Sequence, residues 1–387
     1  MRVLQVARYG SVRGGVETYV ATLSDGLRAA GHEVALAYGI ELHPARAERT
    51  FHVPGVTEPG TSTPDDALGE AIEAFSPDVI HVHVPEVPWV TPYAAARAPT
   101  LLAVHDHRLD CPVGTRYWAG WRRACTIAPG PICLAYNVVA HCGSLRANVT
   151  LRPYRSWRRA RASSAQARLQ VFSSAMADAL ERAGIERARV GVTAYPVPPP
   201  ADPIPPEDDD RRPIVLAPGR LTREKGFREL VESMDHVTTS VHLVIAGSGH
   251  DRGWLERRAR TIGRRHRITF TGWLDPRRLA GWRARASIVV LPSMWPEPFG
   301  IVGLEAMAAG LPVVAFDAGG IAEWLQDGVT GTLVAPGDVP ALGAALTAMV
   351  EDEPMRTRMG EAARARAEAF TIERHLEALM ALYGGAA

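Results

Sequence analysis

The stretch SMWPEPFGIVGLEAMAAGLPVVAFDAGG, residues 293–320, carries the pattern that decides the fold. Its apolar run LPVVAF (311–316) is typical of a parallel strand buried on both faces, and residues 301–309 predict a helix before it. Two acids interrupt this pattern: Glu297 lies in a Pro-rich loop and Glu305 lies inside the helix. Because an ionised carboxylate among apolar residues needs hydrogen-bond donors or solvent, Glu305 is a candidate binding residue.

The two acids admit a functional and a structural interpretation. The hydroxyls of a ribose would satisfy the Glu305 carboxylate. The backbone amides at the start of the predicted helix, those of Phe299, Gly300 and Ile301, would hold an anionic group. Alternatively, Glu297 is an acid at a helix N-terminus and Glu305 is a core carboxylate paired with an arginine. The sequence alone leaves both interpretations open.

A cationic loop precedes this stretch, in PGRLTREKGF (218–227), between a predicted strand and a predicted helix. It contains Arg220 and Lys225, and Lys225 is the single lysine among 43 basic residues. A loop that leads into a helix N-terminus is a frequent anion site, and two cations suit a diphosphate. The alternatives are a solvated surface loop, or a structural ion pair between Arg220 and Glu224.

Strands and helices alternate along the whole chain. This alternation predicts an α/β protein with two Rossmann-like, doubly wound parallel-sheet domains that face each other across a cleft. We expect the domains at 1–195 and 213–370, joined by a solvated, Pro-rich linker at 196–212. The predicted strands are 2–7, 33–38, 78–83 and 100–105 in the first half, and 213–219, 241–247, 267–272, 287–292, 311–316 and 331–336 in the second.

Composition narrows the class of protein. The chain has 387 residues with 43 basic and 42 acidic side chains, and 47% of its residues are hydrophobic. These values exclude a disordered or fibrous chain, and no uncharged apolar run approaches the roughly 18 residues of a membrane span. A net charge of +1 without a recognition motif argues against a nucleic-acid partner. The N-terminus lacks a signal-peptide pattern, so we expect a cytoplasmic protein.

Possible metal ligands are present but badly spaced. The cysteines Cys111, Cys125, Cys133 and Cys142 lack the close pairs of structural zinc sites, so free thiols are the default expectation and zinc the alternative. The acids Asp208-Asp209-Asp210 formally match a metal-binding Asp-x-Asp pattern. They lie in the Pro-rich linker, so we expect a solvated charge run instead.

Residues 111–177 form a local basic block, with ten arginines and no aspartate or glutamate. Within it, residues 152–168 combine arginines with Tyr154 and Trp157 on a predicted helix. One interpretation is an ordinary solvated face. The other is a surface for an anionic acceptor such as a lipid-linked phosphate, with peripheral contact between residues 146–168 and the inner face of an anionic membrane.

The combination of these motifs resembles the signature of the retaining glycosyltransferases of family 4, also called group 1, which have the GT-B fold. The resemblance extends over nearly the whole chain. It rests on Glu297-Pro298-Phe299-Gly300, Glu305, Ala309-Gly310-Leu311-Pro312-Val313-Val314, Gly319-Gly320, Gly219-Arg220-Leu221, Lys225-Gly226, Ala246-Gly247-Ser248-Gly249, Gly14-Gly15-Val16-Glu17 and Val104-His105-Asp106.

The resemblance implies a role for each matching residue. Arg220 and Lys225 would hold the diphosphate of a nucleotide-sugar donor, and Glu305 would bind its ribose. Glu297, with the amides of Phe299, Gly300 and Ile301, would bind the donor sugar, while Gly249 lies in a glycine-rich turn at the nucleotide. In the first domain, Gly15 would approach the diphosphate and His105 the reacting sugar. The helix 371–383 would pack back on the N-terminal domain.

The implied reaction transfers a hexosyl group from a UDP- or GDP-sugar to a hydroxyl acceptor with retention, in glycan, glycolipid or glycosylated-metabolite biosynthesis. Because fixed cations stabilise the departing diphosphate, no divalent metal and no other cofactor is expected. The alternatives are a sugar-nucleotide epimerase or phosphorylase-type enzyme of the same fold, and a non-catalytic nucleotide-sugar-binding protein.

Overall fold

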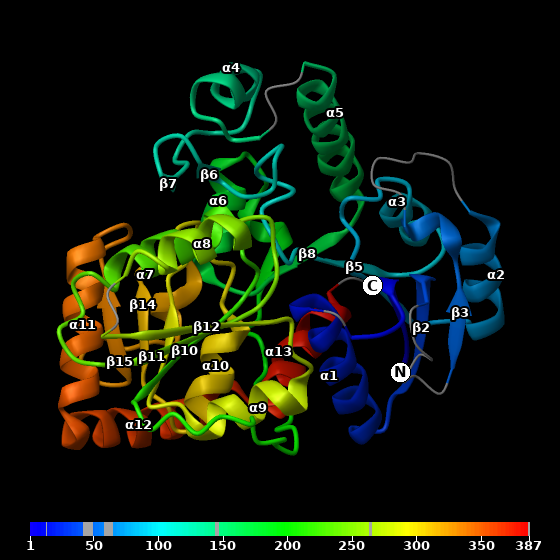
Figure 1. The fold of residues 1–387 in the computed structure, drawn as a ribbon. Coiled ribbons are helices and arrows are strands. Elements are labelled where there is room, and N and C mark those ends of the chain that lie inside the picture. The colour runs from blue at the N-terminus through cyan, green and yellow to red at the C-terminus, as the bar shows by residue number, and fades with distance from the viewer. Residues whose placement is uncertain (13, 42–48, 58–64, 144–146, 263–264, 386–387) are drawn as a thin grey trace. The chain divides into compact units, whose positions relative to one another are not determined.

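The computed structural model of the protein describes residues 1–12, 14–41, 49–57, 65–143, 147–262 and 265–385 (Figure 1). The chain divides into two compact units. Unit 1 comprises Met1–Arg116, Thr126–Pro198 and Phe370–Ala387, and unit 2 comprises Tyr117–Cys125 and Pro199–Ala369. The sequence placed residues 117–125 in the first domain, whereas the structure groups them with the second.

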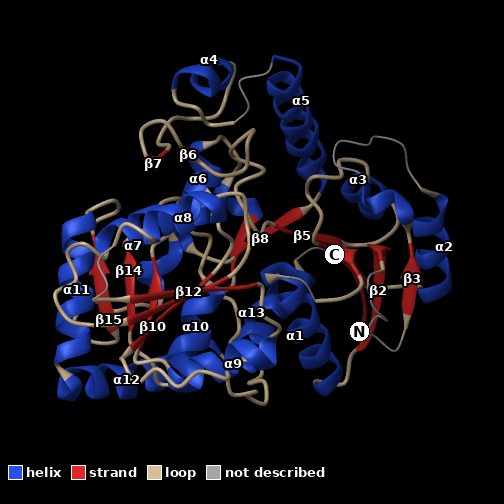
Figure 2. Ribbon diagram, viewed as in Figure 1, coloured by secondary structure: helices blue, strands red, loops and turns tan. Residues whose placement is uncertain are grey.

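Unit 1 is built on a seven-stranded parallel sheet (Figure 2). Its first strand, β1 (Arg2–Tyr9), pairs with β2 on one side and β4 on the other, so the strand order reverses beside β1. The apolar run predicted at 2–7 is buried because helices cover both faces of such a sheet. The order is β3 (Thr50–His52), β2 (Glu33–Ile40), β1, β4 (Val79–Val82), β5 (Thr100–Ala103), β8 (Arg168–Val171) and β9 (Val190–Val192).

The helices of unit 1 include one that comes from the far end of the described chain. Helix α13 (Ile372–Gly384) packs against α1 (Gly15–Ala29), as the neighbouring red and blue helices of Figure 1 show. At the contact, a Cβ on Gly26 would lie 2.3 Å from Cγ1 of Ile372, so only a glycine fits there. The other helices are α2 (Asp66–Phe75), α3 (Val90–Ala95), α4 (Ile132–Val139), α5 (Ala147–Ser163) and α6 (Ser174–Arg182).

Unit 2 contains a six-stranded parallel sheet in the order of the classical dinucleotide-binding folds. The order reverses between β10 and β13, which pair directly with each other. The strands are β12 (Arg267–Gly272), β11 (His242–Ala246), β10 (Ile214–Pro218), β13 (Ile288–Leu291), β14 (Val313–Phe316) and β15 (Gly331–Val334). The helices are α7 (Phe227–Ser233), α8 (Arg252–Ala259), α9 (Pro276–Arg285), α10 (Ile301–Ala308), α11 (Val339–Glu351) and α12 (Glu353–Ala367).

Two smaller features complete unit 2. A short hairpin of β6 (Tyr117–Trp118) and β7 (Arg123–Ala124) attaches to α7 through Arg122, which forms ion pairs with Glu229 and Glu232. The acidic run that was expected to be solvated is partly buried. The Asp208 carboxylate is only 4% exposed and accepts a hydrogen bond of 3.1 Å from Arg267, so this expectation was wrong: the run anchors the segment to β12.

Candidate active site

The loops after β10 and β13 meet at the point where the strand order of unit 2 reverses, the usual ligand position in such sheets. Gly226 allows the meeting. It has a φ of +68°, and a Cβ there would lie 1.7 Å from the carbonyl oxygen of Pro292. Any side chain would therefore separate the two loops. The backbone contact brings Lys225, after β10, beside Glu297, after β13.

Lys225 and Glu297 form a closely paired, mostly buried ion pair. The Lys225 Nζ donates to Oε1 and Oε2 of Glu297 at 2.8 and 2.9 Å, with the two side chains 16% and 10% exposed. The indole Nε1 of Trp295 donates to Oε2 of Glu297 at 2.5 Å, and Lys225 Nζ lies 4.7 Å from the centre of the Trp295 ring. Burial by itself would raise the pKa of Glu297, but Lys225 and the donors Ser293 and Trp295 outweigh it and lower that pKa. Glu297 is thus held as a carboxylate.

The Gly-Gly pair of the motif fixes the backbone of Glu297. Gly320 donates its amide to the carbonyl of Glu297 at 2.7 Å, and Gly319 forms a parallel bridge with Glu297. A Cβ on Gly319, whose φ is +64°, would lie 2.4 Å from that carbonyl oxygen. Helix α10 begins at Ile301, shortly after Glu297 in the chain, as predicted. The amides of Gly300 and Ile301 are therefore at a helix N-terminus, next to the ion pair.

Phe299 lies between Glu297 and α10. Trp324, in the segment after β14, contacts both Phe299 and α10 and fixes their positions. The indole of Trp324 donates to the Phe299 carbonyl at 2.6 Å. This indole lies over Gly303, where a Cβ would meet it at 2.0 Å. The start of the helix is therefore held from two sides before any ligand arrives.

The remaining predicted donor residues of unit 2 occupy different environments. Arg220 is exposed, and no ion pair joins it to Glu224 in the described parts of the chain, where Glu224 accepts from the Thr222 hydroxyl at 2.6 Å. Gly249 allows the turn after β11 to contact the loop after β10, because a Cβ there would lie 2.2 Å from the Leu221 carbonyl oxygen. Both residues border the loop of Lys225.

Glu305 has the arginine partner that its structural interpretation required. Arg283, in the last turn of α9, donates to Oε2 of Glu305 at 2.6 Å. Burial raises the pKa of Glu305, and the attraction of Arg283 offsets part of this effect. An ionised Glu305 is under-solvated even with Arg283 in place, so further donors such as ribose hydroxyls would stabilise it. Its ribose role stays a prediction.

In unit 1, His105 follows β5 and is held by two hydrogen bonds. Its Nε2 and Nδ1 lie 3.0 Å from His83 Nδ1 and 2.6 Å from the Tyr195 hydroxyl. The Nε2 of His83 is 2.6 Å from the Gln5 side-chain oxygen, which only accepts, so His83 donates there and accepts from His105. His105 therefore carries its proton on Nε2 and accepts from Tyr195. Burial lowers the pKa of His105 to about 3, so its ring is neutral at pH 7.

Gly15 is exposed and is the first residue of α1, which follows the carboxyl end of β1. It lies in the first turn of a helix, where backbone amides can bind an anion. Trp295, Arg283, His83 and Tyr195 were not predicted as site residues. The available signals were the position of Trp295 two residues before Glu297, and a histidine in the apolar strand that ends at His83.

The described residues contain no group of three or more His, Cys, Asp or Glu side chains arranged to hold a metal ion. Cys111 and Cys133 are free thiols in the structure. Within the described ranges, no helix combines the length and apolar character needed to cross a bilayer.

Comparison with known proteins agrees with this architecture. Residues 201–366 match the family model "Glycosyl transferases group 1", and residues 13–199 match "Glycosyltransferase Family 4". An uncharacterized glycosyltransferase of Methanocaldococcus jannaschii is 42% identical over 132 residues, 34% of this chain and 33% of the relative. The alpha-D-kanosaminyltransferase of Streptomyces kanamyceticus is 37% identical over 155 residues, 39% and 40% of the two chains. The matches thus span only about a third to two-fifths of these relatives.

Solved structures share the fold over the full length. Anabaena HepE in complex with UDP-glucose superposes with a TM-score of 0.72 at 19% identity and covers 99% of this chain and 100% of its own. WaaG, a glycosyltransferase of lipopolysaccharide biosynthesis, gives a TM-score of 0.67 at 18% identity, with 98% and 99% covered. With a family model matched by each half and a shared two-sheet architecture, the chain belongs to the group 1, family 4 glycosyltransferases of GT-B fold.

Proposed function

We propose that the protein transfers a hexosyl group from a UDP- or GDP-sugar to a hydroxyl acceptor, with retention and without a divalent metal. The observation that carries the proposal is the Lys225–Glu297 pair at the strand-order reversal of unit 2. It holds a fixed cation beside a fixed carboxylate, and this supports a proposal in which Lys225 binds the diphosphate and Glu297 binds sugar hydroxyls. The HepE structure with UDP-glucose, of the same fold, supports a nucleotide-sugar donor.

The chemistry follows from the charge that develops on the leaving group. As the bond from the anomeric carbon to the diphosphate oxygen breaks, negative charge accumulates on that oxygen. Lys225, Arg220 and the N-terminus of α10 would stabilise it, which is the role that a metal ion has in other sites. We therefore propose metal independence.

Retention in a single step, without a covalent intermediate on the protein, requires the acceptor oxygen to attack the face from which the diphosphate departs. In the proposed step, the bond between the acceptor oxygen and the anomeric carbon forms as the bond to the diphosphate breaks. The diphosphate oxygen takes the proton of the acceptor hydroxyl. No nucleophile of the protein is then needed. Glu297 would bind hydroxyls of the transferred sugar, and the neutral His105 ring would border the reacting centre from unit 1.

The test is a panel of UDP- and GDP-sugars screened by thermal shift, followed by measurement of nucleotide release with the best stabiliser, with and without EDTA. We expect one donor to stabilise the protein and to be turned over in EDTA. Activity that EDTA abolishes and Mg²⁺ or Mn²⁺ restores would remove metal independence. Epimerised donor without nucleotide release, or tight binding without turnover across acceptors, would favour the alternatives over transfer.

We also propose peripheral contact with the inner face of an anionic membrane. The exposed face of α5 supports this, because Arg152, Arg155 and Arg158 are exposed and form no ion pair with any acid of the described residues. Like charges three and four residues apart on a helix repel each other, and an anionic surface would relieve that repulsion. Of the 146–168 stretch, Arg146 lies outside the described residues. Co-sedimentation with vesicles that does not depend on their anionic lipid content would refute the contact.

A further inference from the structure

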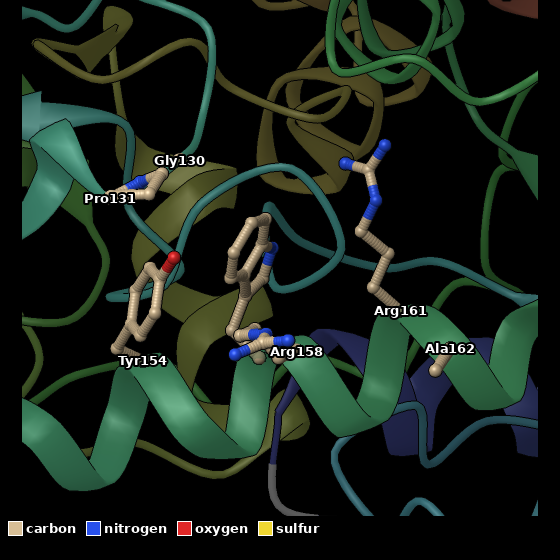
Figure 3. Close-up of a pocket in the computed structure, with 7 residues that line it drawn as sticks. Gly130, Pro131, Tyr154, Arg158, Arg161 and Ala162 are labelled. Carbon is tan, nitrogen blue, oxygen red and sulfur yellow. The ribbon is translucent and has the colours of Figure 1, made fainter.

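A recess of about 590 Å³ lies against α5 within unit 1, where it is bordered by the loop at Pro131. Figure 3 shows Tyr154 and Arg161 rising from α5 on the same side of the helix, with the Tyr154 hydroxyl directed toward Pro131. Tyr154, Trp157, Arg158 and Arg161 line it. They recur at spacings of three and four residues, so they form a single face of the helix. The recess is within the size range of small-molecule sites.

The Arg161 guanidinium is incompletely satisfied in this recess. Its Nη2 donates to the carbonyl of Ala183, whereas Nη1 is buried without a hydrogen-bond partner among the described residues. Burial lowers the pKa of Arg161, with only a partial opposing effect from Asp110. A buried guanidinium nitrogen without an acceptor is unfavourable, and an anion in the recess would satisfy it.

The surroundings also favour a phosphate group. Arg158 is exposed one turn before Arg161, so two guanidinium groups border the same space. Guanidinium groups match phosphate oxygens in bidentate geometry. In the described parts of the chain no carboxylate forms an ion pair with Arg158 or Arg161, and the nearby Asp110 is paired with His107 and Arg116. The indole Nε1 of Trp157 is already bonded to the carbonyl of Leu109 at 3.0 Å, so the indole offers its apolar face to a ligand.

The recess is connected to the predicted reaction site of unit 1. Leu109, which Trp157 holds, lies four residues after His105 in the loop that leaves the carboxyl end of β5. Ligands of open α/β sheets bind at this end of the strands. A group bound in the recess would therefore contact Trp157, whose indole is bonded to the loop that begins at His105.

We propose that this recess binds the phosphate of the acceptor, a phosphomonoester or phosphodiester carried by a soluble polyol or sugar phosphate or by a lipid headgroup. The inference rests on the proposed transfer reaction and assigns a chemical class to its acceptor. Arg158 and Arg161 bind the phosphate, and the rings of Tyr154 and Trp157 contact the organic part of the molecule.

The experiment compares Arg158→Gln and Arg161→Gln with Arg182→Gln as a matched control. Arg182 is an exposed arginine in the last turn of α6, in the same unit but outside the 146–168 stretch, and it does not line the recess, so its substitution changes the net charge equally. One arm measures the binding of inorganic phosphate and of glycerol 3-phosphate by calorimetry. The other arm measures co-sedimentation with phosphatidylcholine vesicles that contain phosphatidylglycerol. Circular dichroism and UDP affinity show whether each variant keeps its fold.

We expect Arg158→Gln and Arg161→Gln to weaken binding by about tenfold or more in one arm, as for a lost charge-assisted hydrogen bond, and Arg182→Gln by less than about twofold. The arm that shows this difference identifies the soluble or the lipid source. Equal losses in all three variants, or no binding in either arm, would overturn the inference. Failure of the transfer reaction would be separate, because it would show as missing UDP binding or turnover in the unaltered protein.

Discussion

Removal of the Lys225 ammonium should lower the free energy of unfolding of unit 2 and weaken nucleotide binding. The two effects can be measured separately. Lys225→Met deletes the bonds of 2.8 and 2.9 Å and leaves the Glu297 carboxylate, 10% exposed, without its counter-ion. Breaking a buried pair from one side costs about 3–5 kcal/mol. Because Glu297 keeps the Trp295 donor, we expect about 3 kcal/mol, at the lower end. Urea unfolding at pH 7.5 without ligand measures this loss.

A double-mutant cycle isolates the pair from other effects of the substitutions. Glu297→Gln keeps an acceptor for Trp295 but removes the charge, so the double variant Lys225→Met/Glu297→Gln should recover about 2 kcal/mol of the loss. A coupling energy near zero would refute the reasoning, because it would mean that the two side chains do not stabilise each other in solution.

Measurements of nucleotide binding show whether Lys225 and Glu297 bind the donor or only stabilise the fold. Lys225→Met should weaken UDP or GDP binding by about 1.5–3 kcal/mol, the range for a hydrogen bond to a charged group. Glu297→Gln should bind the nucleotide at least as tightly, because it releases Lys225 from its carboxylate, yet it should lose turnover. Calorimetry on both variants decides. Equal weakening in both would refute the assignment of Lys225 to the diphosphate and Glu297 to the sugar.

Three further outcomes follow from the site. Glu305→Gln should weaken UDP binding about tenfold, measured by calorimetry. It should bind 2′-deoxy-UDP nearly as well as the unaltered protein binds 2′-deoxy-UDP. Equal effects on both nucleotides would favour a role only as the partner of Arg283. His105→Ala should reduce turnover far more than UDP affinity, and parallel losses would contradict its place at the sugar. The pKa of His105 is lowered to about 3 and that of His375 to about 4, both mainly by burial. Below pH 6.5 the unfolded chain therefore binds more protons than the folded chain. The free energy of unfolding should fall by up to about 1.4 kcal/mol per pH unit for each histidine as the pH decreases toward 4. In urea unfolding measured across this pH range, His375→Gln should show a smaller dependence of the free energy of unfolding on pH than the unaltered protein.

Much of the framework was predictable because apolar strands that are buried on both faces leave a local signal. The helix expected at 301–309 is α10 (Ile301–Ala308), and the strand expected at 267–272 is β12 (Arg267–Gly272). Motif spacing also pointed to Glu297 and Lys225. Their direct bond was not predictable from spacing, because it depends on backbone contact between loops that are 72 residues apart.

The features that sequence reasoning missed depend on partners far away in the chain. The hairpin containing Arg122 belongs to unit 2 because its guanidinium reaches Glu229, 107 residues later. His105 was predicted at the reacting sugar, but its ring is held by His83 and by Tyr195, which are 22 and 90 residues away. Asp208 was misjudged because no local pattern indicated Arg267. Local periodicity carries no information on such contacts.

The packing of α13 on α1 has a consequence for biogenesis. During synthesis on a ribosome, the whole of unit 2 emerges before α13. Unit 1 therefore cannot complete its core until the end of the chain has been synthesised. Two buried hydrogen bonds connect it to α13, from Tyr19 to His375 and from His81 to Tyr383, and each spans more than 300 residues. Loop closure over such separations is slow relative to local folding. Premature termination after Ala369 would therefore expose Tyr19 and His81, and we expect such fragments to be recognised by chaperones and proteases although their nucleotide-binding half can fold.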